Sequence, residues 1–252
     1  MKKPLELIRI DAAAPDRPTI VFLHEGLGSV ALWRDFPAAV ARRANANAVV
    51  YSRAGNGFSP VLGRSRQPSY MHDEALSVLP ALLAELQIER PILIGHSDGG
   101  SIALIYAGAH PAEVRALVVL APHVFVEDLS LRSIAAMRQT YETTDLPQRM
   151  ARYHADAAAT FYGWNDVWLA PEFRSWNIES SCEKIAAPLL AIQGTDDKYG
   201  TPAQLDAIAA RTHGQTDCVL LARCGHAPHV DRREFVESLV ADWLLVQTGS
   251  SA

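Results

Sequence analysis

Cysteine is scarce in this sequence, and its spacing suits neither disulfides nor zinc. The 252 residues contain three cysteines, Cys182, Cys218 and Cys224, and no C-x-x-C pair. An odd number of cysteines without that spacing predicts free thiols. The sequence also lacks the Gly-x-Gly-x-x-Gly and Gly-Lys-Ser/Thr motifs that hold nucleotides. We therefore expect neither a metal nor a bound cofactor.

An excess of positive charge and a long apolar run are absent too. The formal net charge is −5 at pH 7, which leaves no basic surface for nucleic acid. The longest apolar run, residues 116–122, is far shorter than the ~20 residues that cross a membrane. Charges at Glu6, Arg9 and Asp11 interrupt any signal-peptide core. We expect a cytoplasmic protein that binds a small-molecule substrate, without a nucleic-acid or membrane partner.

Hydrophobic residues make up 49% of the chain, which is enough for a substantial core. They form short, mostly apolar runs at residues 19–23, 48–51, 91–94, 116–120, 188–192 and 218–221. Strands that are apolar on both faces and separated by helices indicate a parallel sheet covered on both sides. Helical spacing is seen in Met71, Ala75, Leu79, Leu82, Leu83 and Leu86, and again in Phe235, Leu239, Trp243 and Val246.

One long stretch interrupts the alternation of strands and helices. Residues 125–182 contain no strand-like run and are rich in aromatic side chains. An insertion in an open α/β sheet lies near the carboxyl ends of the strands, where ligands bind. We predict a helical cap at 125–182 on a core domain of residues 1–124 and 183–252. Trp164 and Trp168 of this cap, and His123 after the run at 116–121, are the candidate substrate-binding residues, although packing alone would also explain them.

Ser97 lies in a Gly-x-Ser-x-Gly motif, Gly95-His96-Ser97-Asp98-Gly99. The motif comes directly after one apolar run and opens a helical pattern, the strand, turn and helix order that a nucleophilic serine of this kind requires. Glycines suit the sharp turn, because side chains at their positions would collide with the neighbouring strand and helix. Ser97 would then be exposed at the N-terminus of the helix, where developing negative charge is favoured.

A serine hydroxyl needs a base within hydrogen-bond reach and a third group that orients the base. The run at 188–192 leads to Asp196 and Asp197, and the run at 218–221 leads to His226. Both polar groups follow the carboxyl ends of predicted strands, so they should lie at the same edge of the sheet as Ser97. His226 is the predicted base, and one of the two aspartates is its acid.

From residue 19 to about residue 246, the chain resembles the α/β-hydrolase superfamily in this motif and in the order Ser, acid, His. The resemblance implies an α/β fold with a mostly parallel, eight-strand-type sheet and a helical cap insertion. It also implies that Ser97 is the nucleophile, His226 the base and Asp197 the acid, by the family's usual spacing from the glycine that ends the strand. Asp196 is the competing acid. A minority of members carry the acid after the preceding strand, where Asp128 lies too far along.

Two backbone N–H groups should bind the oxyanion that forms in such a reaction. One belongs to Asp98, the residue after the nucleophile. By the resemblance, the other lies in the loop after the first apolar run, on Gly26 or on Leu27, and we prefer Gly26. Glu25 departs from the family pattern, which usually has a glycine there. We expect Glu25 either to pair with an arginine such as Arg53 or to take part in catalysis.

These residues predict acyl transfer to water through an acyl-enzyme on Ser97. Carboxylic esters, including lactones and thioesters, are the expected substrates, because serine at this position disfavours the dehalogenase and epoxide hydrolase branches of the family. The same triad would serve a hydrolase that cleaves a carbon-carbon bond next to a ketone. The fold could also hold a small ligand without catalysis. His226, His229 and Asp231 could be interpreted as metal ligands, but no other Cys or His cluster completes a shell.

Overall fold

The structure is a computed structural model, and it describes residues 4–12, 16–63 and 65–249. Its centre is a seven-stranded sheet in the order β1-β3-β2-β4-β5-β6-β7. Six strands are parallel, and only β1 runs antiparallel, beside β3. The strands are β1 Leu7–Ile10, β2 Thr19–Leu23, β3 Asn47–Tyr51, β4 Ile92–His96, β5 Ala116–Leu120, β6 Leu189–Gly194 and β7 Thr216–Leu221.

The predicted mostly parallel α/β fold is confirmed, and each of the six apolar runs overlaps a parallel strand. The described residues hold seven strands, whereas the prediction was a sheet of eight-strand type. Strand β1 was not expected from the sequence. It lies at the edge of the sheet with a partly exposed side chain at every position, including Arg9. A strand that is not buried on both faces has no continuous apolar run by which to detect it.

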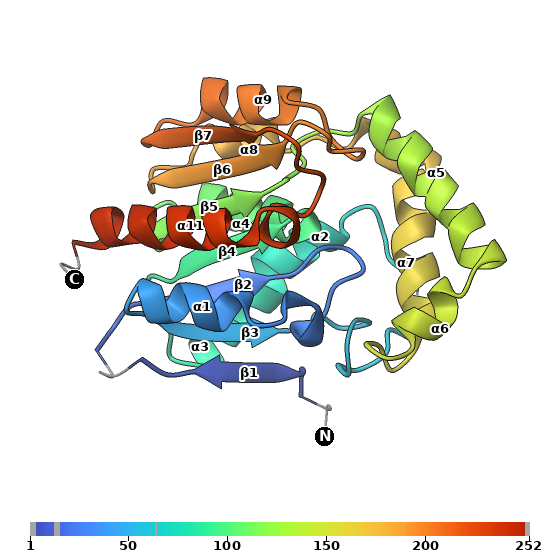
Figure 1. Ribbon diagram of the computed structural model, residues 1–252, viewed down its shortest axis with the longest axis horizontal. Coiled ribbons are helices and arrows are strands. Elements are labelled where there is room, and N and C mark those ends of the chain that lie inside the picture. Colours follow the sequence, from blue (N-terminus) through green and yellow to red (C-terminus); the bar gives the residue numbers. More distant parts are fainter. Residues whose placement is uncertain (1–3, 13–15, 64, 250–252) are drawn as a thin grey trace.

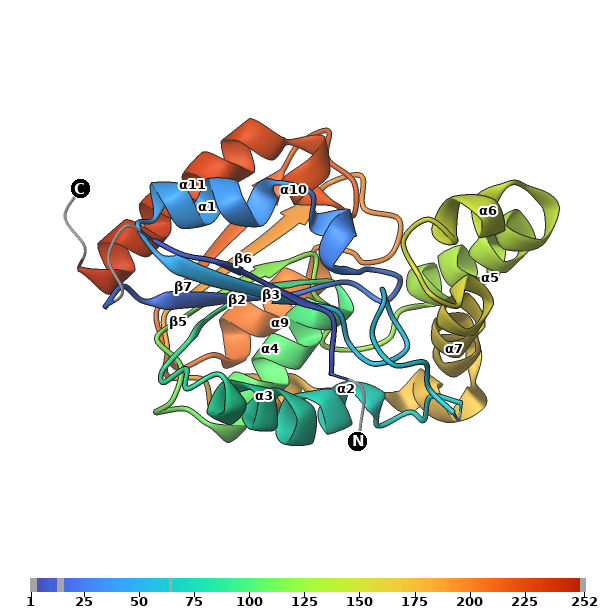
Figure 2. The same cartoon turned by 90° about the horizontal axis from the view of Figure 1, so that it is seen from below.

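Helices cover both faces of the sheet. On one face lie α1 Phe36–Arg43 and α11 Arg233–Thr248, and on the other lie α3 Leu79–Glu85, α4 Asp98–Ala109 and α9 Ala203–Arg211 (Figures 1 and 2). Successive side chains of a strand point to opposite faces. In β2, Ile20 and Phe22 therefore pack into the first layer, whereas Val21 and Leu23 pack into the second.

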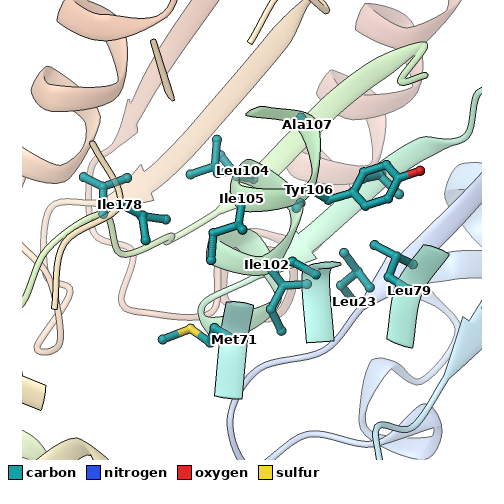
Figure 3. Close-up of a cluster of buried hydrophobic side chains, with 14 of the residues drawn as sticks. Leu23, Met71, Leu79, Ile102, Leu104, Ile105, Tyr106, Ala107 and Ile178 are labelled. Carbon is teal, nitrogen blue, oxygen red and sulfur yellow. The ribbon is translucent and has the colours of Figure 1, made fainter. Parts of the chain in front are cut away.

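Helix α4 lies at the centre of the second layer and is buried from Asp98 to Gly108. Figure 3 shows its apolar side chains between Leu23 of the sheet, Met71 and Leu79 of the neighbouring helices, and Ile178. These helices are α2 Tyr70–Asp73, the π-helical turn η2 Glu74–Val78, and α3. Because α4 is packed on all sides, its N-terminus is held in a fixed position.

Between β5 and β6 the chain forms α5 Asp128–Thr143, α6 Leu146–Met150 and α7 Ala157–Leu169, and then the 3-10 turn η3 Pro171–Ser175. These inserted helices (α5 to α7) stand beyond the carboxyl ends of the parallel strands (Figures 1 and 2). The next helix, α8 Glu179–Cys182, packs instead against α4 and α9. The division into a core domain and a cap at residues 125–182 stays a prediction.

The remaining helical segments are η1 Val30–Trp33 and α10 Pro228–Asp231. All three cysteines are free thiols, as predicted. In the part of the chain that the structure describes, no helix has both the length and the apolar character that crossing a membrane requires.

Candidate active site

Ser97 lies between β4 and α4 in a strained backbone conformation. Its φ of 52° and ψ of −119° are rare for a residue with a side chain. The flanking glycines permit this turn, because a Cβ on Gly95 would collide with the carbonyl oxygen of Gly99, and one on Gly99 with that of Leu23. The turn places Ser97 at the N-terminus of α4, at the carboxyl edge of the sheet.

His226 and Asp197 meet Ser97 at this edge, each on the loop after a parallel strand. The Nε2 atom of His226 lies 2.9 Å from Ser97 Oγ, and its Nδ1 atom lies 2.9 Å from both carboxylate oxygens of Asp197. Since a carboxylate can only accept, Nδ1 carries the proton and Nε2 is free to accept one from the serine. The structure thus brings together the three residues that the sequence singled out.

Asp197 is held by its surroundings as well as by His226. Its Oδ1 atom accepts a hydrogen bond from the backbone N–H of Tyr199 at 2.8 Å. Burial alone would raise the pKa of Asp197, but the hydrogen bond from His226 and the charge on that ring lower it below its ordinary value. Asp196 is exposed and accepts from the hydroxyl of Thr195 at 3.0 Å. Of the two aspartates, Asp197 is the one that is hydrogen-bonded to His226.

Asp128, the other alternative acid, begins α5 and forms an exposed ion pair with Arg174 at 2.6 Å. It lies on the inserted helices and takes no part in the contact with His226.

Ser97 opens into a cavity of about 120 Å³ beneath the inserted helices. Trp164, Trp168 and His123, the predicted substrate-binding residues, all line it, as do Gly26 and Asp98 of the predicted oxyanion hole. The cavity is lined by Glu25, Gly26, Leu27, Ser97, Asp98, His123, Ile134, Trp164, Trp168, Tyr199 and His226. Ile134 and Tyr199 carried no signal in the sequence that pointed to this pocket.

Asn56 holds the loop that follows β2 through two hydrogen bonds. Its side-chain amide donates to the carbonyl oxygens of Gly26 and Gly28, both at 3.0 Å. A Cβ on Gly26 would collide with the indole of Trp164. Glycine is therefore required at position 26 for the inserted helices to approach this loop.

Glu25 does not pair with Arg53, contrary to the first of the two expectations. The buried Arg53 guanidinium donates to the carbonyl oxygens of His24 at 2.5 Å and of Glu25 at 3.0 Å, and its Nη2 lies 3.9 Å from the carboxylate of Asp98. The Glu25 carboxylate lies 3.4 Å from Nδ1 of His96. Burial would raise the pKa of Glu25, but the hydrogen bond and charge of His96 hold it well below its usual range.

The family model described as "Alpha/beta hydrolase family" matches residues 20–238. The chain belongs to the alpha/beta hydrolase family. A proline iminopeptidase of Lactobacillus delbrueckii subsp. lactis is 25% identical over 280 residues, which cover 95% of this chain and 94% of that protein. A 2-hydroxymuconate semialdehyde hydrolase of Pseudomonas sp. (strain CF600) is 24% identical over 248 residues, with 89% and 86% covered.

Solved structures agree with this assignment of the fold. The enol-lactonase from Burkholderia xenovorans LB400 matches with a TM-score of 0.73 at 20% identity, over 95% of this chain and 96% of that one. The chain is therefore a hydrolase by family, and its relatives' names differ in the bond that is cleaved.

In this hydrolase, a buried network links the inserted helices to the turn that carries Ser97. Tyr70 donates its hydroxyl hydrogen to Asp98 Oδ2 at 2.5 Å and accepts from Trp168 Nε1 at 3.0 Å. Burial and the charge of Asp98 raise the pKa of Tyr70 well above its ordinary value, so the phenol stays a donor. The sequence carried no signal for this link, because its members are far apart along the chain.

His229 and Asp231, which the sequence also offered as metal ligands, contact other groups of the protein. His229 packs at a tilted angle against both Trp33 and Phe36, with ring centroids 4.9 and 5.4 Å away. Burial and the charge of His96 lower the pKa of His229 to about 3. Asp231 accepts from the backbone N–H of Gly225 at 2.8 Å. Among the described residues, no group of three or more His, Cys, Asp or Glu could hold a metal ion.

Proposed function

We propose that this hydrolase cleaves small carboxylic esters, lactones or thioesters through an acyl-enzyme on Ser97. The observation that carries the proposal is the continuous hydrogen-bonded path from Ser97 Oγ through both nitrogens of His226 to Asp197. Such a path turns a weak hydroxyl into a nucleophile at neutral pH.

The reaction would begin when Ser97 Oγ attacks the carbonyl carbon and passes its proton to Nε2 of His226. The backbone N–H groups of Asp98 and Gly26 stabilise the oxyanion, as preorganised donors in a site with little water. His226 then protonates the leaving group, and the acyl-enzyme remains. A water molecule, activated by the same histidine, releases the acid. Asp197 keeps the proton on Nδ1 throughout.

The size of the cavity supports a small acyl group. Its volume of about 120 Å³ is somewhat below the ~150 Å³ cavity that holds a benzene molecule. Trp164, Trp168 and Ile134 supply apolar walls on the side of the inserted helices. A short alkyl chain or a single ring fits this volume, whereas a long fatty acyl chain does not.

A panel of substrates tests the proposal. Nitrophenyl esters with two- to ten-carbon acyl chains, small lactones and acyl thioesters should be hydrolysed, with the highest kcat/KM at the short end. Ser97→Ala and His226→Ala should each lower kcat by several orders of magnitude without changing the melting temperature much, because the two residues act as a unit.

The same panel includes a prolyl anilide and vinylogous diketones, since the names of two relatives refer to proline and to a semialdehyde hydrolase. Turnover of either, with all esters left intact, would replace ester hydrolysis by amide or carbon-carbon cleavage. Near-normal turnover by Ser97→Ala would refute the mechanism itself.

A further inference from the structure

Glu25 brings a charge to the active site that the triad does not use. It lines the cavity beside Ser97, and 29% of its side chain remains exposed. Its partner His96 lies behind it, with 5% of the side chain exposed, and is not among the lining residues. The Nε2 atom of His96 is hydrogen-bonded to the carbonyl oxygen of His226 at 2.7 Å. The cavity therefore meets the carboxylate of this pair, not the imidazole.

The positive partner of this carboxylate, His96, lies behind it and not in the wall of the cavity. The described residues that line the cavity include no lysine and no arginine. The carboxylate of Asp98 is only 1% exposed and is bound by Tyr70, so it contributes less to the field inside. Burial and the charge of His226 lower the pKa of His123 to about 3, which leaves that ring neutral. The cavity is thus small and mostly apolar, and of the Glu25–His96 ion pair only the carboxylate lines it.

We propose that Glu25 is a specificity-determining residue, which excludes acyl groups that carry a carboxylate and admits neutral or cationic ones. The proposal rests on the proposed ester hydrolysis for its substrates. Between apolar walls, where the effective dielectric constant is low, two like charges a few ångströms apart repel strongly. An ammonium group in the same place is attracted. We expect about a 10- to 100-fold separation in kcat/KM between matched anionic and neutral substrates.

Three ethyl esters of nearly equal size measure this separation. Ethyl hydrogen succinate carries an anion at the end of the acyl chain, ethyl succinamate a neutral amide, and ethyl 4-aminobutyrate a cation. At pH 7, kcat/KM should be at least about tenfold lower for the succinate than for the succinamate, and the aminobutyrate should equal or exceed the succinamate. Equal rates for succinate and succinamate would overturn the proposal.

Two variants with the same change in net charge identify the residue responsible. Glu25→Gln keeps the shape of the side chain and should raise the succinate-to-succinamate ratio of kcat/KM by about tenfold. Glu142→Gln, at an exposed position of α5, should leave that ratio unchanged. An unaltered ratio in Glu25→Gln, or an equal change in Glu142→Gln, would remove Glu25 from substrate selection.

Boronic acids give a measurement that does not depend on turnover. Calorimetry with the wild-type protein should show tighter binding of 4-carbamoylphenylboronic acid than of its 4-carboxyl counterpart. If no ester is hydrolysed but this preference appears and disappears in Glu25→Gln, the proposed ester chemistry fails and the selectivity stands. If esters are hydrolysed and the two boronic acids bind equally, the selectivity fails alone.

Discussion

Replacing Asp197 by asparagine tests the choice of the catalytic acid. The amide of the new side chain would face Nδ1 of His226 with either a donor or a weaker acceptor, so the ring would no longer be held with its proton on Nδ1. Its Nε2 atom could then not accept the proton of Ser97. Loss of the correct tautomer costs about 10⁴ in kcat, which corresponds to about 5.4 kcal/mol of transition-state stabilisation.

The fold should tolerate this change. An asparagine oxygen can still accept from the backbone N–H of Tyr199, which lies 2.8 Å from Asp197 Oδ1, and the two side chains have almost the same shape. We therefore expect a fall in kcat with only a small change in melting temperature. A fall in activity that merely followed a loss of folded protein would not support the role of Asp197.

Asp196→Asn is the matched control, because Asp196 is exposed and contacts only its neighbour Thr195 through its side chain. Its kcat/KM on the best nitrophenyl ester should stay within about threefold of the wild type, as for most surface changes. Equal losses in the two variants, or a larger loss in Asp196→Asn, would refute the assignment of the acid.

Three further predictions concern the surroundings of the nucleophile. Tyr70→Phe should lower the free energy of unfolding by about 1.5 to 3 kcal/mol, the value of a hydrogen bond to a charged group, and should lower kcat more than it changes KM. Urea unfolding and ester kinetics measure both. Trp164→Ala should widen the accepted acyl chain length by ~1 to 3 kcal/mol of discrimination, and unchanged chain-length ratios would remove it from the pocket. Glu25→Gln should destabilise the protein most between pH 4.5 and 6.5, and urea unfolding across the pH range measures this. The pKa of Glu25 is lowered from 4.5, so its contribution is lost as pH falls, and the pKa of His96 is raised from 6.5, so its contribution is lost as pH rises. A difference that is constant with pH would contradict the pairing.

The sheet could be predicted from the sequence because its central strands are buried on both faces. Such strands read as unbroken apolar runs, and β4 and β5 are buried at every position. The same reasoning missed β1, whose four residues are half exposed. It also found the helix α11 without identifying its buried side, since Phe235 and Val246 are exposed while Val236 and Val240 face the core.

The positions of Ser97, Asp197 and His226 could be predicted because each follows a parallel strand, and parallel strands bring their carboxyl ends to one edge. Sequence spacing alone left Asp196 and Asp197 open. Only burial and hydrogen bonding separate them, since one side chain turns inward to the histidine and its neighbour turns to solvent.

Contacts between distant side chains could not be predicted in the same way. Tyr70 and Trp168 are separated by 98 residues, and neither belongs to a motif. Together with the bond from Tyr70 to Asp98, their hydrogen bond joins the inserted helices to the turn that carries Ser97. The pairing of Glu25 with His96 was missed for the same reason, because an arginine appeared to be the natural partner of a buried acid. In the structure, Arg53 donates to two backbone carbonyl groups and faces the carboxylate of Asp98 instead of that of Glu25. Charge and nearness in the sequence do not show which acceptors an arginine meets in the fold, so the contact between Glu25 and His96 could be found only from the three-dimensional arrangement.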